Sequence, residues 1–239
     1  MIENKILEIK EYLSKYQIDG YVIPKNDEFF SEFDQFDRLK KITNFSGSAG
    51  LAVITKNNNY LFVDGRYTIQ AKNQAGKNFK ILDITNNPPS NFFKNIILGL
   101  DPKIFTKKTI MRFFSRKTRI KEIEDNLIDK IIKSKIKKNK EFYSLSKIVT
   151  GETKNSKINR VVKFLKNIKA DYLFVTAPEN VAWLLNIRGS DNPNSPIPNS
   201  HLIITKEKKL FLFAEKYKVN KIIKNKEINK KSVCTNKWN

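Results

Sequence analysis

The chain has 239 residues, of which 40% are hydrophobic, so it carries enough apolar material for one large domain or two ordinary ones and is not globally disordered. No apolar run approaches the roughly 18–20 residues that a membrane span needs. A single cysteine, Cys234, excludes an internal disulfide, and the charged N-terminus lacks the apolar core of a signal peptide, so we expect a cytoplasmic protein.

The formal net charge of +22 raises the question of nucleic-acid binding. The excess is mostly lysine, spread along the chain together with Asn and Ile, whereas arginine, the better reader of bases and phosphates, is scarce. We therefore favour compositional bias with solvated lysines and regard nucleic acid as an unlikely partner. Weak, salt-sensitive, non-specific nucleic-acid binding stays open as an alternative.

The first half of the chain predicts alternating helices and strands. Apolar residues spaced by four and three positions predict a helix over residues 2–16. A short strand closed by Pro24 follows, then a polar loop with a broken helix, and then a hairpin. Further elements are expected as a helix over 66–75, strands over 79–84 and before Asp101, and a long helix over 118–141.

The second half repeats this order. A helix is predicted over 156–168, a strand before Pro178, a short helix over 179–185, and a hairpin whose strands are 201–205 and 210–213. Gly47 aligns with Gly189, and Tyr67 aligns with Tyr217. The same order of elements with different loop lengths indicates an internal duplication.

The duplication sets the expected domain boundaries: a first domain over 1–132, a linker over 133–150 and a second domain over 151–239. Only 22 residues follow Tyr217, and they are rich in lysine and asparagine. We therefore expect the second domain to be truncated, with a poorly ordered tail from about residue 220. A sheet that lacks its outer strand and helix exposes an edge and an apolar face.

No motif of the sequence predicts catalysis. His201 is the only histidine and lies in a different segment from Cys234, so the two cannot make a zinc or iron site. An all-carboxylate Mn or Mg site stays open in principle, but the acidic residues are scattered, so we assign no metal site. No G-x-S-x-G elbow is present. The GSAG stretch over 47–50 leads into a strand rather than a helix, so it lacks the geometry of a phosphate loop.

Two polar corners are the remaining candidates for function. Asp64, Gly65 and Arg66 follow a strand, where Asp64 is suited to cap the next helix and Arg66 to reach a partner or ligand. Arg188 and Asp191 form a similar corner in the second copy. For both corners a structural role is favoured over a binding role. Trp183, with apolar neighbours, is predicted to lie in the core.

Several blocks resemble the first two domains of three-domain aminopeptidase P, the cytosolic Xaa-Pro aminopeptidases. The first domain is matched by NFSGSAGLAVIT and YLFVDGRYTIQA, and its later part by LGLDPKIFT over 98–106 and NLIDKII over 126–132. The second domain is matched by PENVAWLLNIRGSDNPNSPIPNSHLIIT over 178–205. The blocks are collinear over about residues 1–220 and specific in combination.

The resemblance implies an α/β fold of two tandem creatinase N-terminal-like domains, each a mixed sheet flanked by helices. It also implies a third, pita-bread catalytic domain, in which two Asp, one His and two Glu hold a pair of metal ions, often manganese, and a metal-bound hydroxide attacks the bond before proline. No part of these 239 residues resembles that domain. No metal ligand is therefore carried over, and no cofactor is expected in this chain.

The resemblance thus predicts the non-catalytic N-terminal portion of a Xaa-Pro aminopeptidase, a metallopeptidase that acts on proline-containing peptides. Such a portion contributes to the shape of the substrate entrance and to oligomer contacts, including a possible homodimer. Asp64, Arg66, Arg188 and Asp191 become candidate entrance or interdomain contacts. The alternative is a stand-alone subunit that docks a separately encoded catalytic domain.

Overall fold

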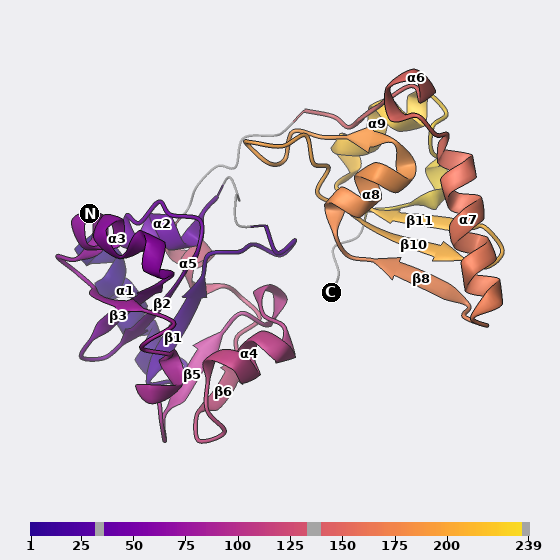
Figure 1. Cartoon of the computed structure of the whole chain (residues 1–239). Helices are drawn as coiled ribbons and strands as arrows, with labels where there is room; N and C mark the ends of the chain where they lie inside the picture. Colours follow the sequence, from indigo (N-terminus) through magenta and orange to yellow (C-terminus); the bar gives the residue numbers. More distant parts are fainter. Residues whose placement is uncertain (32–35, 133–139, 236–239) are drawn as a thin grey trace. The chain divides into compact units, whose positions relative to one another are not determined.

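The computed structural model describes residues 1–31, 36–132 and 140–235, which fall into two compact units (Figure 1). The first unit ends with the helix before residue 132, and the second begins at about residue 140. The predicted linker over 133–150 is therefore wrong in its second part. Phe142 is fully buried in the core of the second unit, and residues 143–144 and 147–150 form a strand and a short helix. Residues 133–139 lie outside the described part.

The first unit is built on a six-stranded mixed sheet with the order β4-β3-β2-β1-β5-β6. Its strands are β1 (Gly20–Pro24), β2 (Gly50–Thr55), β3 (Asn59–Val63), β4 (Lys80–Asp83), β5 (Ile97–Leu100) and β6 (Arg119–Glu122). The meander β1-β2-β3 is antiparallel, and β4, β5 and β6 each run parallel to the strand that they join. The strand β6 falls where the sequence predicted a helix. Its edge hydrogen bonds to β5 outweigh the helix propensity of this polar segment.

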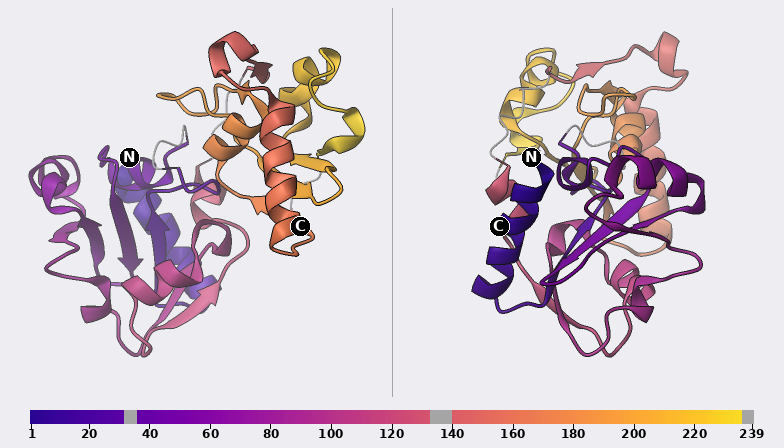
Figure 2. Two further views of the ribbon diagram at one scale, coloured as in Figure 1. Left: turned by 45° about the vertical axis from the view of Figure 1, so that its right-hand side comes forward. Right: turned by 90° about the vertical axis from the view of Figure 1, so that its left-hand side faces the viewer.

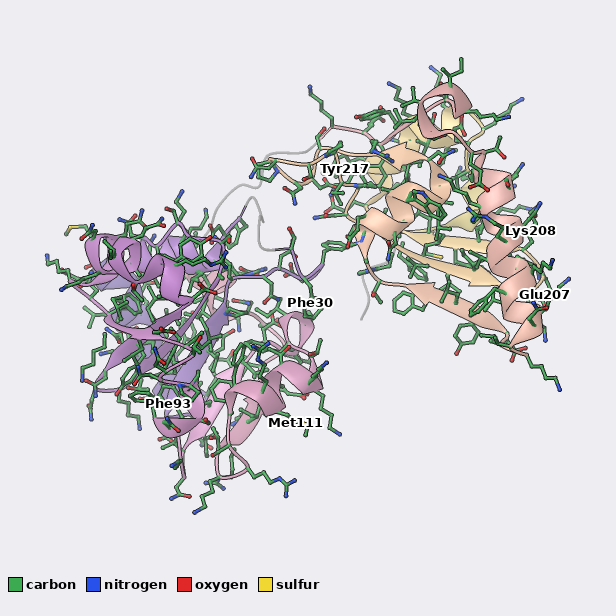
Figure 3. All side chains as sticks on the ribbon, in the orientation of Figure 1. Phe30, Phe93, Met111, Glu207, Lys208 and Tyr217 are labelled. Carbon is green, nitrogen blue, oxygen red and sulfur yellow. The ribbon has the colours of Figure 1, made fainter. Side chains whose placement is uncertain are left out.

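Helices cover both faces of this sheet. They are α1 (Ile2–Lys15), α2 (Arg38–Thr43), η1 (Gly65–Tyr67), α3 (Thr68–Ala75), η2 (Pro89–Asn91), η3 (Pro102–Ile104), α4 (Lys107–Phe113) and α5 (Leu127–Ile131). The α1 helix lies along one face and packs with α2 and α5 (Figures 1 and 2). It does so because its apolar stripe of Ile6, Ile9 and Leu13 is buried there. The other face is closed by an aromatic cluster that includes Phe93 (Figure 3).

The short helix α5 is held in the first unit by polar contacts as well as by packing. Arg38 on α2 donates to Asp129 on α5, with its Nε 2.7 Å from one carboxylate oxygen and its Nη2 2.8 Å from the other. The backbone N–H of Leu127 donates to the hydroxyl of Tyr21 at 3.3 Å. Leu127 and Ile128 are fully buried. The helix therefore closes the space between α1, α2 and β1.

The second unit carries a four-stranded sheet with the order β12-β11-β10-β8 and a small two-stranded pair, β7 with β9. Its elements are β7 (Tyr143–Ser144), α6 (Lys147–Thr150), α7 (Lys154–Asn167), β8 (Tyr172–Val175), α8 (Pro178–Leu185), β9 (Ile187–Arg188), β10 (His201–Thr205), β11 (Leu210–Phe213), α9 (Lys216–Lys224), η4 (Lys230–Ser232) and β12 (Val233–Cys234). The turn between β10 and β11 carries Glu207 and Lys208 (Figure 3).

The order and pairing of these elements confirm the internal duplication. The elements α7, β8, α8, β10, β11, α9 and β12 repeat α1, β1, α2, β2, β3, α3 and β4, with antiparallel meanders and a final parallel strand in both units. The registers also correct one predicted alignment. Asp64 and Glu215 occupy the same N-cap position, so Tyr67 corresponds to Lys218 rather than to Tyr217 (labelled in Figure 3).

The predicted disorder from about residue 220 is wrong for residues 220–235. The α9 helix runs to Lys224, and β12 pairs in parallel with β11. Val219, Ile222 and Ile228 supply the apolar contacts that the lysine-rich composition concealed. The first unit therefore has four elements, β5, β6, α4 and α5, that are not repeated in the described part of the second unit.

Candidate functional site

At the corner after β3, the side chains of Asp64 and Arg66 bond to each other. One carboxylate oxygen of Asp64 accepts hydrogen bonds from the backbone N–H of Arg66 at 3.0 Å and from its Nε at 2.8 Å. These hydrogen bonds hold the pKa of the Asp64 carboxyl below its ordinary value. The prediction that Asp64 caps the following helical turn is confirmed. The guanidinium of Arg66 remains largely exposed.

Tyr67 joins this corner to the glycine-rich turn of the first unit. Its hydroxyl lies 2.9 Å from Ser48 Oγ, and its ring packs edge-on against the buried ring of Phe45 at 5.9 Å between centroids. The GSAG and DGRY blocks are therefore neighbours in space. These contacts connect the start of β2 to the start of α3.

Arg188 and Asp191 follow the short helix α8 and bond to different partners. Arg188 lies on β9, and its Nη1 donates to the carbonyl oxygens of Ala182 and Ile187. Asp191 is almost fully buried and accepts a hydrogen bond from the backbone N–H of Asn199 at 2.7 Å. Both side chains thereby fix the loop that leads from α8 to β10.

Lys218 is a buried partner of Asp191 that the sequence did not reveal. Its Nζ lies 2.9 Å from Asp191 Oδ1, and the two side chains are 7% and 1% exposed. Its backbone carbonyl accepts from the N–H of Phe142 at 2.7 Å, which also ties the start of the second unit to α9. A lysine among many lysines gives no sequence signal for burial, so only the folded chain distinguishes it.

Lys157 is a second buried cation of the second unit. Its Nζ donates to Asn186 Oδ1 at 2.7 Å and to the carbonyl oxygen of Trp183 at 2.9 Å, and it lies 4.3 Å from the centre of the Trp183 ring. Burial lowers the pKa of the Lys157 ammonium. The predicted core position of Trp183 is wrong. Trp183 is 49% exposed, and its ring lies over the Lys157 ammonium on the outer side of the unit.

The described residues do not fit a resident metal centre. In the described ranges 1–31, 36–132 and 140–235, no three His, Cys, Asp or Glu side chains gather in a group able to hold a metal ion. Within those same ranges, none of the helices has the length and apolar character required to span a membrane. Of the four candidate side chains, Asp64, Arg66, Arg188 and Asp191, Arg66 is the most accessible.

Comparison with known proteins assigns both units. Residues 5–123 match one family model of the creatinase/prolidase N-terminal domain, and residues 133–237 match a second family model of the same domain. The crystal structure of X-prolyl aminopeptidase from Caenorhabditis elegans superposes with a TM-score of 0.86 at 24% identity, covering 100% of this chain and 42% of that protein. At this identity the superposition shows the fold.

Curated relatives agree with this assignment. Xaa-Pro aminopeptidase 1 of Dictyostelium discoideum is 31% identical over 243 residues, which cover 92% of this chain and 38% of the relative. Xaa-Pro aminopeptidase ApepP of Drosophila melanogaster is 32% identical, covering 84% of this chain and 35% of the relative. The chain thus spans little more than a third of the length of these relatives. It belongs to the creatinase/prolidase N-terminal domain family and carries two such domains.

Proposed function

We propose that this chain is the non-catalytic N-terminal portion of a Xaa-Pro aminopeptidase. The observation that carries the proposal is the tandem pair of creatinase/prolidase N-terminal domains, matched collinearly to proteins named Xaa-Pro aminopeptidases over most of this chain and about a third of theirs. The release of an N-terminal residue before proline then depends on polypeptide outside the matching stretch.

The metal chemistry of the proposed enzyme belongs to that remainder. A pair of divalent ions, such as manganese, supplies an activated hydroxide when bound. The described residues of this chain offer no ligand cluster for such a pair. Their proposed contribution is therefore to the shape of the substrate entrance and to contacts with the rest of the enzyme or with a second copy.

The two polar corners take different parts in this proposal. Arg66 presents an exposed guanidinium beside Asp64, which suits a contact with a peptide carboxylate or with a neighbouring domain. Asp191 is buried and held by Lys218, so its proposed role is to fix the loop that carries Arg188. Neither corner is proposed as a catalytic centre.

Metal binding tests the proposal. Equilibrium dialysis of the purified 239-residue chain against Mn²⁺ is expected to show less than one tightly bound ion per chain, with the full-length Dictyostelium relative as the positive control. Two tightly bound ions per chain would overturn the proposal. A parallel titration with a peptide that carries proline at its second position is expected to show no metal-dependent binding.

A further inference from the structure

The positive charge of the first unit is concentrated in one part of its sequence. Residues 84–121 carry nine Lys or Arg residues and a single acidic residue, Asp101, which is buried. The other described ranges of this unit, 1–31, 36–83 and 122–132, carry 13 cationic and 13 acidic residues. The net charge of the described first unit therefore lies within residues 84–121.

Arginine gathers in the same part of the chain. Arg112, Arg116 and Arg119 are three of its seven arginines. The lysine excess elsewhere accompanies Asn and Ile, which fits compositional bias, but a bias toward lysine does not bring arginines together within residues 112–119. The planar guanidinium binds phosphate through two parallel hydrogen bonds, so arginines at the surface suit a phosphate-bearing partner.

The α4 helix places these cations on one side. It connects β5 to β6 and packs with its apolar side on the aromatic cluster of the first unit (Figure 1). Lys107, Lys108 and Arg112 are exposed on the other side. Met111, labelled in Figure 3, lies among them and is 69% exposed. The solvent side of α4 is therefore cationic along its length.

The turn between α4 and β6 continues this cationic surface. Arg116 and Lys117 are exposed in the turn, whose backbone is held by the burial of Phe114. The N–H of Asn95 donates to the Lys117 carbonyl at 2.9 Å, which places the exposed Lys94 beside the turn. We call six exposed cationic residues the α4 strip: Lys94, Lys107, Lys108, Arg112, Arg116 and Lys117.

No acidic side chain of the described residues neutralises the α4 strip. In the ranges 1–31, 36–132 and 140–235, none of its six cations has a carboxylate within 4.0 Å. By contrast, Lys25, Arg38 and Lys77 of the same unit each have such a partner. A row of cations without acids between them produces a positive potential that attracts a polyanion.

A nucleic acid suits the α4 strip better than a membrane or an acidic polypeptide does. A helix that binds a membrane surface needs a broad apolar face, whereas the large apolar side chain exposed on α4 is Met111 alone. Acidic polypeptides carry carboxylates at irregular intervals, but a nucleic acid carries a phosphate at every nucleotide, which matches an uninterrupted row of cations.

We propose that the α4 strip binds the phosphate backbone of a nucleic acid without sequence preference. Its arginines supply bidentate contacts, and its lysines supply further charge. The backbone under the strip is fixed by the fold, so the cations need little ordering when a polyanion binds. This binding is independent of the proposed role in a peptidase, because it needs neither a metal ion nor a peptide.

Fluorescence anisotropy of a labelled oligouridylate with the whole 239-residue chain tests the proposal. Arg112→Gln combined with Arg116→Gln is expected to weaken binding about 25-fold at about 0.1 M salt, because two phosphate contacts are lost. The slope of log affinity against log salt concentration is expected to become shallower by about 1.4, since each contact with a single strand contributes about 0.7.

A matched variant separates the α4 strip from general charge. Lys56→Gln combined with Lys72→Gln removes the same charge from exposed positions of the first unit and is expected to change affinity by less than about twofold. Amide exchange of β5 and β6 reports whether each variant is folded. In the unsubstituted chain, photocrosslinks to the oligouridylate are expected within residues 107–117.

Four results would contradict the proposal. They are no binding of the oligouridylate, equal losses in the two double variants, crosslinks that lie only outside the α4 strip, and displacement of the oligouridylate by another anion. For the last, phosphatidylserine vesicles or polyglutamate are added at an equal concentration of charge. Displacement by the vesicles would assign the strip to a membrane surface, and displacement by polyglutamate would assign it to an acidic polypeptide.

Discussion

Lys218 Nζ lies 2.9 Å from Asp191 Oδ1, and both side chains are buried in the second unit. The pair links α9 to the loop between α8 and β10. Removing one partner of a buried ion pair leaves an uncompensated charge without water, which costs more than the pair itself contributes. The pair is therefore a point at which the stability of the second unit is sensitive to a single side chain.

Lys218→Met is expected to destabilise the second unit by about 3–5 kcal/mol, because Asp191 is left buried without its cation. Urea unfolding followed by hydrogen exchange of β10 and β11 amides measures the effect. Lys216→Met on the exposed side of the same helix is the control and is expected to change stability by less than about 0.5 kcal/mol. Equal effects of the two substitutions would refute the account of the pair.

Asp129→Asn is expected to destabilise the first unit by about 1.5 kcal/mol, since Arg38, which also donates to Glu28, then loses its bidentate contact with the Asp129 carboxylate in a nearly buried position. The comparison variant is Asp125→Asn, at the more exposed partner of Lys130. It is expected to have little effect on the same unfolding transition. A loss as large as that of Asp129→Asn would argue against the bidentate contact.

The stability of the second unit is expected to fall as the pH drops below the ordinary histidine pKa of 6.5. Burial lowers the pKa of His201, whose Nδ1 lies 2.9 Å from the Thr176 carbonyl, so the folded unit binds its proton less readily than the unfolded chain. The stabilisation is present above pH 6.5 and is lost as the pH falls through the folded pKa.

The titration of the only histidine checks this directly. Proton NMR of the His201 ring is expected to give a midpoint below 6.5, and His201→Gln is expected to flatten the dependence of stability on pH between 7 and 5. A midpoint at or above 6.5 would contradict the burial argument.

Tyr67→Phe is expected to cost the first unit about 1 kcal/mol, because it removes the hydrogen bond to Ser48 while the ring keeps its contact with Phe45. Chemical unfolding of the first unit measures the loss. The matched change is Tyr143→Phe in the second unit. It is expected to leave the free energy of unfolding unchanged, because the Tyr143 side chain is exposed. No loss in Tyr67→Phe would show that the two glycine-containing blocks are not coupled.

Periodicity was sufficient to predict the repeated elements. The apolar stripes of α1 and α7 and the strands of both hairpins come from contacts close in sequence, and so did the N-cap at Asp64. These features recur at matching positions in both units, which is why the duplication was visible before the fold was known.

Features that depend on distant partners were not predictable. The strand β6 forms because β5 offers it an edge, and β12 forms because β11 does. The buried ammonium groups of Lys157 and Lys218 resemble solvated lysines in every local respect, and their acceptors come from other elements. Trp183 was misplaced for the same reason, since the lysine that it covers lies on another helix.

Peptide hydrolysis tests the central claim most directly. The purified chain is incubated with Mn²⁺ and a peptide that carries proline at its second position, and the products are followed by mass spectrometry, with the full-length Dictyostelium relative as the positive control. The account predicts no release of the N-terminal residue by this chain. Sustained release that a chelator abolishes would contradict it.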